Sequence, residues 1–325
     1  MRVSVIIASY NYGHFVAEAI RSVQEQTVED LEIIVIDDGS TDDTPEVLSA
    51  IRDPRLRAHR IPNSGVAIAR NTGLAMAKGE FIAFLDADDR WRPTKLERQL
   101  VMMESEPELG LIFTNFVRFN EDGFLPHSQF EFSPDLEEVP RRPSRRGGGW
   151  VITGDVFASL VEEQISAWPQ TVMVRADRVR GIQFPPRVRI CEDLHYMLRV
   201  APLVQAAYIT DPLVEVRRHG NNSYSAKLEL MEGGMSVYRN LEQESLSEAH
   251  REVLRRQIGQ SWIGHAYYHY HTRNPVASAS AAIRALRYPD SRWKAIKRLA
   301  LLPAMPMLAN PGNVDWKAKP AAGAE

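Results

Sequence analysis

Two apolar runs in the first hundred residues each end in a pair of carboxylates, Asp37 with Asp38 and Asp86 with Asp88. Two carboxylates one residue apart at the end of a strand suit a hard divalent cation with oxygen ligands, such as Mg²⁺ or Mn²⁺. The alternative is turn and cap chemistry, in which Asp88 or Asp89 caps the helix that follows. The adjacent carboxylates at 37 and 38 repel each other, so they require either strong solvation or a functional role. One of them could accept the N–H of a pyrimidine base, or the pair could belong to a turn.

An alternation of strands and helices must position these side chains. Apolar runs, each followed by helical spacing, predict buried strands at residues 3–8, 31–36 and 81–85. Val- and Ile-rich strands alternating with helices predict an α/β fold with a Rossmann-like, mostly parallel central sheet flanked by helices. Ligands bind such sheets outside the carboxyl ends of the strands. The polar clusters 9–11, 37–40 and 86–89 are therefore expected to open onto one crevice, where Tyr10 could stack on a base or pack on the rim of the sheet.

Composition narrows the class of protein. The chain has 325 residues, 44% of them hydrophobic and 25% charged, which excludes a wholly disordered or fibrous chain. Its 39 Lys and Arg against 42 Asp and Glu give a formal net charge of −3, which argues against a nucleic-acid partner. The single cysteine, Cys191, excludes a disulfide framework and a cysteine zinc cluster. With no signal peptide and no apolar run of ~20 residues, we expect a cytoplasmic protein that could rest on the inner face of the cell membrane.

Further segments are expected to complete the fold. Thr44 is predicted to cap one helix, and Gly79 to end another that begins near Gly65. The segment 133–149, rich in proline, arginine and glycine, predicts a mobile surface loop. Strands are expected near 171–174, 203–209 and 213–217, a helix at 192–200, and only helices beyond 226.

Four segments together resemble glycosyltransferase family 2, whose members are inverting enzymes of the GT-A fold that use nucleotide-sugar donors. They are VSVIIASYN at 3–11, IDDGSTD at 36–42, ARNTG at 69–73 and FLDADD at 84–89. The close match covers roughly residues 1–120, and a looser one runs through ICED at 190–193 to VRRHGNNS at 216–223. One departure is Ala8, where the family usually has proline; it concerns a backbone preference near the nucleotide.

The resemblance implies a nucleoside pocket. Asp38 would bind a uracil-type base, and Ser9, Tyr10 and Asn11 would form the rest of the pocket. Arg70 would approach the base or the diphosphate, whereas its alternative role is that of a solvated charge on a helix.

The resemblance also implies a Mn²⁺ or Mg²⁺ ion. Asp88 would ligate it directly, while Asp86 would touch the ribose or the water shell of the metal. His219 would be a further metal or phosphate contact, with Arg217 or Arg218 near the diphosphate. The ion would offset the negative charge that builds on the departing nucleoside diphosphate.

An inverting transfer needs a base on the acceptor side, because the attacking hydroxyl must lose its proton as the new bond forms. Glu192 and Asp193 resemble the acidic pair of the family before a helix, and by that match Asp193 is the catalytic base. The alternative is that both acids complement the dipole at a helix N-terminus. Cys191 beside them is expected to pack rather than to act as a nucleophile.

The function expected from the resemblance is inverting, metal-dependent transfer of a sugar, from a UDP-type donor to a saccharide or lipid-linked acceptor hydroxyl in cell-surface polysaccharide or glycoconjugate synthesis. A catalytically silent nucleotide-sugar or glycan-binding protein on the same fold is the alternative. A nucleotidyltransferase is disfavoured because residues 9–14 do not resemble a glycine-rich phosphate loop. The acceptor site is expected to include Trp168, Pro169 and Gln170, and the arginine- and glycine-rich loop near 141–149 is expected to form a mobile lid over it.

The expected domains follow this assignment. Residues 1–225 would form the GT-A catalytic domain, with a nucleotide-sugar half to residue 120 and an acceptor half after it. Residues 226–310 would form a helical C-terminal extension, and 311–325 a disordered tail. Six basic residues lie near the end of the extension, with Trp293 and Ile296 among them: Arg284, Arg287, Arg292, Lys294, Lys297 and Arg298. These helices could contact a membrane peripherally or pack on the catalytic domain with a solvated basic face.

Overall fold

The computed structural model describes residues 1–220 and 227–302. The chain separates into two compact units, the first from Met1 to Leu241 and the second from Glu242 onward. The predicted division after residue 225 lies within six residues that the structure does not describe, so that boundary stays a prediction. The predicted tail, 311–325, also lies outside the described residues.

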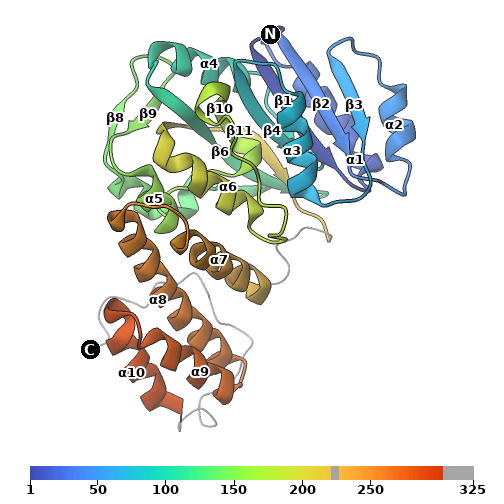
Figure 1. Ribbon diagram of the computed structural model, residues 1–325. Helices are drawn as coiled ribbons and strands as arrows, with labels where there is room; N and C mark the ends of the chain where they lie inside the picture. The colour runs from blue at the N-terminus through green and yellow to red at the C-terminus, as the bar shows by residue number, and fades with distance from the viewer. Residues whose placement is uncertain (221–226, 303–325) are drawn as a thin grey trace. The chain divides into compact units, whose positions relative to one another are not determined.

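The first unit is built on an 11-stranded sheet in the order β3-β2-β1-β4-β10-β6-β11-β9-β8, with β5 and β7 paired off this path to β11 and β6 (Figure 1). Strands β1, β2, β3 and β4 run parallel. Strand β10 is antiparallel to both β4 and β6, and β11 is parallel to β6. The bounds are β1 Val3–Ser9, β2 Leu31–Asp37, β3 Leu56–Arg60, β4 Phe81–Asp86, β5 Arg90–Trp91, β6 Leu109–Asn120, β7 Gly123–Ser128, β8 Arg141–Pro143, β9 Gly149–Ile152, β10 Met173–Arg175 and β11 Gln205–Arg217.

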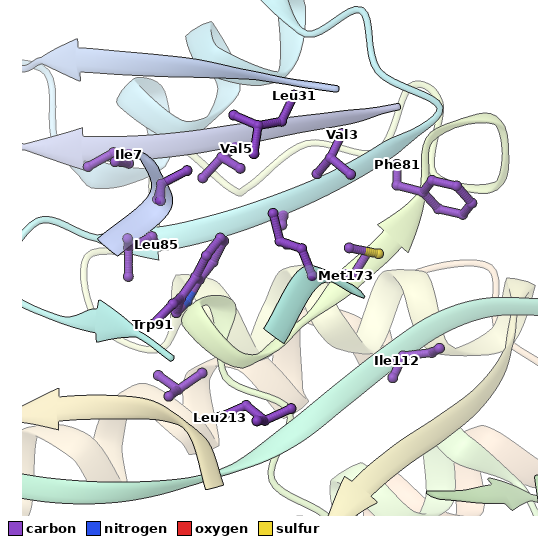
Figure 2. Close-up of a cluster of buried hydrophobic side chains, with 14 of the residues drawn as sticks. Val3, Val5, Ile7, Leu31, Phe81, Leu85, Trp91, Ile112, Met173 and Leu213 are labelled. Atoms are coloured by element: carbon purple, nitrogen blue, oxygen red, sulfur yellow. The ribbon is translucent and has the colours of Figure 1, made fainter. Parts of the chain in front are cut away.

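Helices cover both faces of the parallel strands because the strands are apolar on both sides. Val3, Val5 and Ile7 of β1 pack in one core cluster with α1, and Figure 2 shows them beside Leu31, Leu85 and Trp91. Ile34 and Ile36 pack on the other face with Ala69 of α3. The α-helices described are α1 Gly13–Gln24, α2 Thr44–Ala50, α3 Val66–Met76, α4 Lys95–Ser105, α5 Val156–Val161, α6 Glu192–Val200, α7 Lys227–Glu242, α8 Glu248–His271, α9 Pro275–Ala285 and α10 Arg292–Leu301.

Gly73 lets α3 lie close to β1. A Cβ added at this position would lie 2.3 Å from Cγ2 of Ile6, so no larger residue fits without a shift of the helix. We expect Gly73→Val to lower the free energy of unfolding by about 1–3 kcal/mol, measured by urea denaturation. Gly234→Ala in α7 is the matched control, because a Cβ there meets nothing within 4 Å. It should be neutral or stabilising by up to ~1 kcal/mol, and equal losses in both variants would contradict this account of the glycine.

Several expected boundaries differ from the structure. Strand β3 was not predicted, because Leu56–Arg60 is half-exposed and polar and carries no apolar run. The strand β11 is continuous where two strands were expected, with register shifts near Pro212. Helix α2 begins at Thr44 itself, whose N–H donates to Oδ1 of Asp42 at 3.1 Å. Helix α3 ends at Met76, three residues before the expected end at Gly79.

The segment 133–149 is not the irregular loop that was predicted. Its second half forms β8 and the start of β9, which pair with each other, and β9 joins the sheet through β11. Arg142 makes two hydrogen bonds to the buried Glu106, at 3.0 and 2.8 Å, and lowers the pKa of that carboxyl to about 2. Arg142 and Arg145 thus pair with Glu106, just after α4, and Arg142 also pairs with Glu108. The proposed lid role has no support in this arrangement.

The second unit is helical, as expected for the C-terminal extension. Helices α8 and α9 pack through small residues, Ala266 against Ala281 and Ala282, with Trp262 and Leu299 at the edge of the cluster. Among the described residues, no helix is both long enough and apolar enough to span a bilayer.

Candidate active site

The predicted polar clusters meet at one edge of the sheet. Because β1 pairs in parallel with both β2 and β4, Ser9 lies opposite Asp37 and Ala8 lies opposite Asp86. The residues that follow these three strands therefore leave the sheet side by side, at its carboxyl edge. This is the convergence that the alternation of strands and helices predicted.

The turns after β1 and β2 are tied together on the side of the expected nucleoside pocket. Asn11 has a positive φ of 56°, its N–H donates to Oγ of Ser40 at 2.9 Å, and its Oδ1 accepts the N–H of Thr41 at 2.7 Å. Tyr10 is exposed beside this turn, and the hydroxyl of Ser9 is buried and makes no hydrogen bond with the described residues. Asn11 therefore fixes the shape of the turn and leaves the Tyr10 ring open to solvent.

Asp38 has a structural task that the sequence did not reveal. Its two carboxylate oxygens accept the backbone N–H groups of Ser64 and Gly65, each at 2.8 Å. The side chain thereby anchors the start of α3 at the end of β2. A carboxylate has further lone pairs, so these bonds leave room for a base N–H.

Asp88 and His219 lie in contact although 131 positions separate them in the chain. Nε2 of His219 is 3.0 Å from Oδ2 of Asp88. The centroid of the His219 ring lies 5.9 Å from that of Tyr12 and 5.3 Å from that of Phe15. Tyr12, just before α1, and Phe15, in its first turn, therefore lie beside the histidine ring. Burial raises the pKa of Asp88, and the nearby charge of Asp86 raises it further. The structure thus brings together the two residues expected to hold a metal.

Arg217 locks the end of β11 against the turn after β4. Its Nε donates to the carbonyl of Asp88 at 2.9 Å, and its backbone N–H donates to Oδ1 of Asp89 at 2.8 Å. Its guanidinium also pairs with Glu18 of α1 and lies 4.5 Å from the centre of the Phe15 ring. Because His219 is only two residues further along the chain, these contacts of Arg217 restrict the positions that the histidine side chain can occupy. An arginine near the diphosphate was expected at this position from the sequence, but its contact with the turn after β4 was not.

Arg218 lies beside this lock. Its backbone N–H donates to the carbonyl of Phe119 at 2.7 Å, and the residue is half-buried just past the end of β11.

Arg70 is buried in α3 and bridges two acids. One guanidinium nitrogen donates to Oδ1 of Asp86 and the other to Oε1 of Glu192, each at 2.8 Å. The guanidinium also lies 5.2 Å from the centre of the Phe184 ring, which stacks on Tyr196 of α6. This bridge links the end of β4 to the start of α6. The role expected for Arg70, a contact with the base or the diphosphate, gave no sign of it.

Asp193 lies in the first turn of α6, next to the bridge. Burial raises its pKa, the charge of Arg70 lowers it, and the charge of Asp86 raises it. The net effect is a carboxyl group that holds a proton more readily than an ordinary aspartate. Cys191 precedes the helix with a φ of 64°, and burial raises the pKa of its thiol to about 12. The thiol therefore stays protonated, which agrees with the expectation that it is no nucleophile.

Of the residues expected near an acceptor, Gln170 contacts an acid of the site, whereas Trp168 packs on an aromatic ring. The Trp168 ring packs 4.7 Å from that of Phe116 and is half-buried. Gln170 hydrogen-bonds Asp89, and its carbonyl accepts the indole N–H of Trp91 at 2.8 Å. These contacts give both residues a structural role, and the expected acceptor role stays a prediction.

The donor set fits a divalent cation that takes part of its coordination from a ligand. Within the described ranges, no three His, Cys, Asp or Glu side chains converge as a complete metal cage. The pair Asp88 and His219 supplies one carboxylate and one imidazole. Mg²⁺-type sites commonly use one or two carboxylates together with waters and substrate phosphates. The residues present therefore fit an ion completed by phosphate oxygens rather than one caged by protein.

Comparison with solved structures identifies the fold. The chain shares its fold with the crystal structure of S. aureus TarS 1-349 in complex with UDP-GlcNAc, at a TM-score of 0.65, with 18% identity, 94% of this chain and 92% of that chain covered. It shares it also with the mannosyltransferase PcManGT from Pyrobaculum calidifontis in complex with GDP-Man and Mn²⁺, at a TM-score of 0.55, with 19% identity and 94% and 86% covered. The architecture is thus the GT-A fold, a mostly parallel sheet flanked by helices, with C-terminal helices following it.

The sequence matches define the family. The family model "Glycosyl transferase family 2" matches residues 4–160. The putative teichuronic acid biosynthesis glycosyltransferase TuaG of Bacillus subtilis (strain 168) is 31% identical over 244 residues, which cover 74% of this chain and 88% of the relative. The chain belongs to glycosyltransferase family 2.

Other relatives are longer than this chain, and the matches cover only part of each protein. An uncharacterized glycosyltransferase of Rickettsia felis is 35% identical over 228 residues, or 68% of this chain and 34% of that protein. The UDP-Glc:alpha-D-GlcNAc-diphosphoundecaprenol beta-1,3-glucosyltransferase WfaP of Escherichia coli is 39% identical over 137 residues, or 41% of this chain and 53% of that protein. The chain thus spans about a third of the length of several curated relatives that it matches.

Proposed function

We propose that this chain is an inverting, metal-dependent glycosyltransferase. It would move a sugar from a nucleoside-diphosphate sugar, of the UDP type, to the hydroxyl of a saccharide or lipid-linked acceptor in cell-surface polysaccharide or glycoconjugate synthesis. The observation that carries the proposal is the 3.0 Å contact between Asp88 and His219 at the carboxyl edge of the parallel strands. The cytoplasmic location expected from the sequence stays a prediction.

The donor nucleoside binds between the turns after β1 and β2. The exposed ring of Tyr10 offers a stacking surface, and Ser9, Asn11 and Asp38 supply polar groups beside it. Two proteins of the same fold support this side of the proposal, because TarS was solved in complex with UDP-GlcNAc and PcManGT in complex with GDP-Man.

The diphosphate end lies over Asp88 and His219, which would hold Mn²⁺ or Mg²⁺. An ion held by these two residues would supply positive charge to offset the charge that develops on the leaving nucleoside diphosphate. PcManGT, which was solved with Mn²⁺, supports this choice of metal. Arg217 holds the turn that carries Asp88. Arg218, the next residue, would lie near the diphosphate. Arg70 holds Asp86 in position for a contact with the ribose or with a water of the metal.

Asp193 takes the proton of the acceptor hydroxyl. In an inverting displacement, the hydroxyl oxygen bonds to the anomeric carbon from the face opposite the leaving diphosphate, the bond to the diphosphate breaks, and the hydroxyl proton passes to the carboxylate. Its raised pKa suits proton transfer near neutral pH, because it lies nearer to the operating pH than that of an ordinary aspartate. Arg70 and Glu192 orient the first turn of α6 that carries it.

A catalytically silent binding protein on this fold is the other candidate, and no specific observation favours it. The direct test is donor consumption by the full chain with Mn²⁺ over a panel of UDP- and GDP-sugars, with and without a panel of saccharide and polyprenyl-diphosphate saccharide acceptors. We expect one donor to be consumed faster with one acceptor than by hydrolysis. Donor binding by calorimetry with no turnover across the panel would favour the silent binder and contradict the proposal.

Arg217 is predicted to be a positioning residue. Lysine keeps the charge but cannot bond to Asp88 and Glu18 from one planar group, so Arg217→Lys should weaken the apparent Mn²⁺ affinity in the turnover assay by roughly 10- to 100-fold. At saturating Mn²⁺, kcat should recover much of its wild-type value. Arg180→Lys, at an exposed position, is the control. A fall in kcat with an unchanged Mn²⁺ dependence would argue against the positioning role.

A further inference from the structure

Helix α10 presents an apolar face to solvent. Trp293 and Ile296, one turn apart, are 66% and 49% exposed, and Leu301 at the end of the helix is also exposed. Ala295, on another face of the same helix, is fully buried. The helix thus contacts the rest of its unit through Ala295 and the half-buried Leu299, and leaves Trp293 and Ile296 uncovered. Such side chains are normally the ones a helix buries.

Helix α9 repeats this arrangement. Val276 is 78% exposed, and Ile283, two turns further along the same face, is also exposed. These side chains line a shallow hollow together with Arg284 and Arg287. The small residues Ala281, Ala282 and Ala285 are the buried ones. Both helices therefore turn aliphatic or aromatic side chains outward.

The same stretch of chain is strongly basic, although the whole protein is slightly acidic. Residues 273–302 contain seven Lys and Arg and a single acid, Asp290. The exposed Lys294 and Lys297 flank the apolar face of α10, and Nζ of Lys297 lies 5.5 Å from the centre of the Trp293 ring. The seven cations are Arg273, Arg284, Arg287, Arg292, Lys294, Lys297 and Arg298. We call the exposed side chains of α9 and α10 the basic apolar surface.

We propose that the basic apolar surface binds the headgroup region of an anionic lipid bilayer. Interfacial helices combine an apolar face that enters the boundary of headgroups and acyl chains with Lys and Arg that meet anionic lipids, and tryptophan favours that boundary. A second copy of the chain is a poor occupant, because two surfaces of the same strong positive charge would repel each other. A nucleic acid would use the cations but leave the apolar side chains uncovered. The inference concerns the second unit alone and does not depend on the proposed transfer reaction.

The test is co-sedimentation of the full chain with vesicles, either of phosphatidylcholine alone or of phosphatidylcholine with phosphatidylglycerol. We expect binding to the anionic vesicles that weakens in high salt. Lys294→Glu with Lys297→Glu should reduce the partition coefficient by about tenfold or more, and Trp293→Ala with Ile296→Ala should reduce it without removing the salt dependence. The matched control for charge is Arg52→Glu with Lys78→Glu, at exposed positions of the first unit, which should bind as the wild type does.

Three results would overturn the proposal. Failure of the wild type to bind anionic vesicles is one, and equal loss in the control and the α10 charge variant is another. The third is self-association in sedimentation velocity that Trp293→Ala with Ile296→Ala abolishes, in a protein that does not bind vesicles, because the occupant would then be a second copy. Circular dichroism and thermal melting confirm that each variant is folded, so a loss of binding is not a loss of structure.

Discussion

Asp193→Asn is expected to lower kcat for sugar transfer by roughly 10²- to 10⁴-fold, the usual contribution of a general base. The amide cannot take the proton of the acceptor hydroxyl, while it keeps the size of the side chain in the first turn of α6. The affinity for the donor nucleotide should stay close to that of the wild type, because Asp38 and Tyr10 lie on other loops. Initial rates at saturating donor and calorimetric titration of UDP measure the two quantities.

The pH profile gives the same prediction a second readout. Burial raises the pKa of Asp193, and the base works only when it is deprotonated, so kcat should rise with pH through that raised pKa. In Asp193→Asn this acid limb should disappear from the residual rate. Asp177→Asn, at an exposed position, is the control and should keep both the rate and the limb. A wild-type rate in Asp193→Asn would remove the residue from the mechanism.

Asp88→Asn is expected to lower kcat/KM for the donor by roughly a hundredfold or more, because a carboxylate that would hold the cation is lost. The loss should be partly reversed at high Mn²⁺, since His219 remains. In the wild type, removal of divalent ions with EDTA should abolish turnover, and Mn²⁺ or Mg²⁺ should restore it.

A double-mutant cycle sharpens this test. If Asp88 and His219 act on one ion, the losses in Asp88→Asn and His219→Gln should not add, and the double variant should resemble the worse of the two. Asp122→Asn, in the exposed turn between β6 and β7, is the matched carboxylate control. Additive losses, or turnover that EDTA leaves unchanged, would contradict a shared metal site.

The strand ends could be predicted because their geometry is local and repetitive. An apolar run that ends in acids fixes both the strand and the place where it leaves the sheet, so Asp38, Asp86 and Asp88 were expected at one edge. The helix that carries Asp193 was also expected from residue 192 to 200, and it occupies those residues. The metal pair depended on the family resemblance, since nothing near His219 in the chain distinguishes it from a structural histidine.

The contacts that hold the site could not be predicted, because they join distant parts of the chain. The bridge from Arg70 to Glu192 spans 122 positions, and the bond from Arg217 to Asp88 spans 129. Pairing of an arginine with an acid depends on the packing of α3, α6 and β11, not on its neighbours in sequence. The same reason explains the error at 133–149, where Arg142 finds its partner in Glu106. A basic, glycine-rich composition describes a solvated loop and a paired edge hairpin equally well.

The most direct test of the central claim is the anomeric configuration of the first product, followed by ¹H NMR. The full chain is incubated with Mn²⁺ and whichever α-linked UDP-sugar it consumes, with the acceptor present. In-line attack by a hydroxyl that Asp193 deprotonates predicts a β-linked product with release of UDP, and no product when Mn²⁺ is removed. An α-linked first product would contradict the account, and so would transfer that proceeds equally well without a divalent ion.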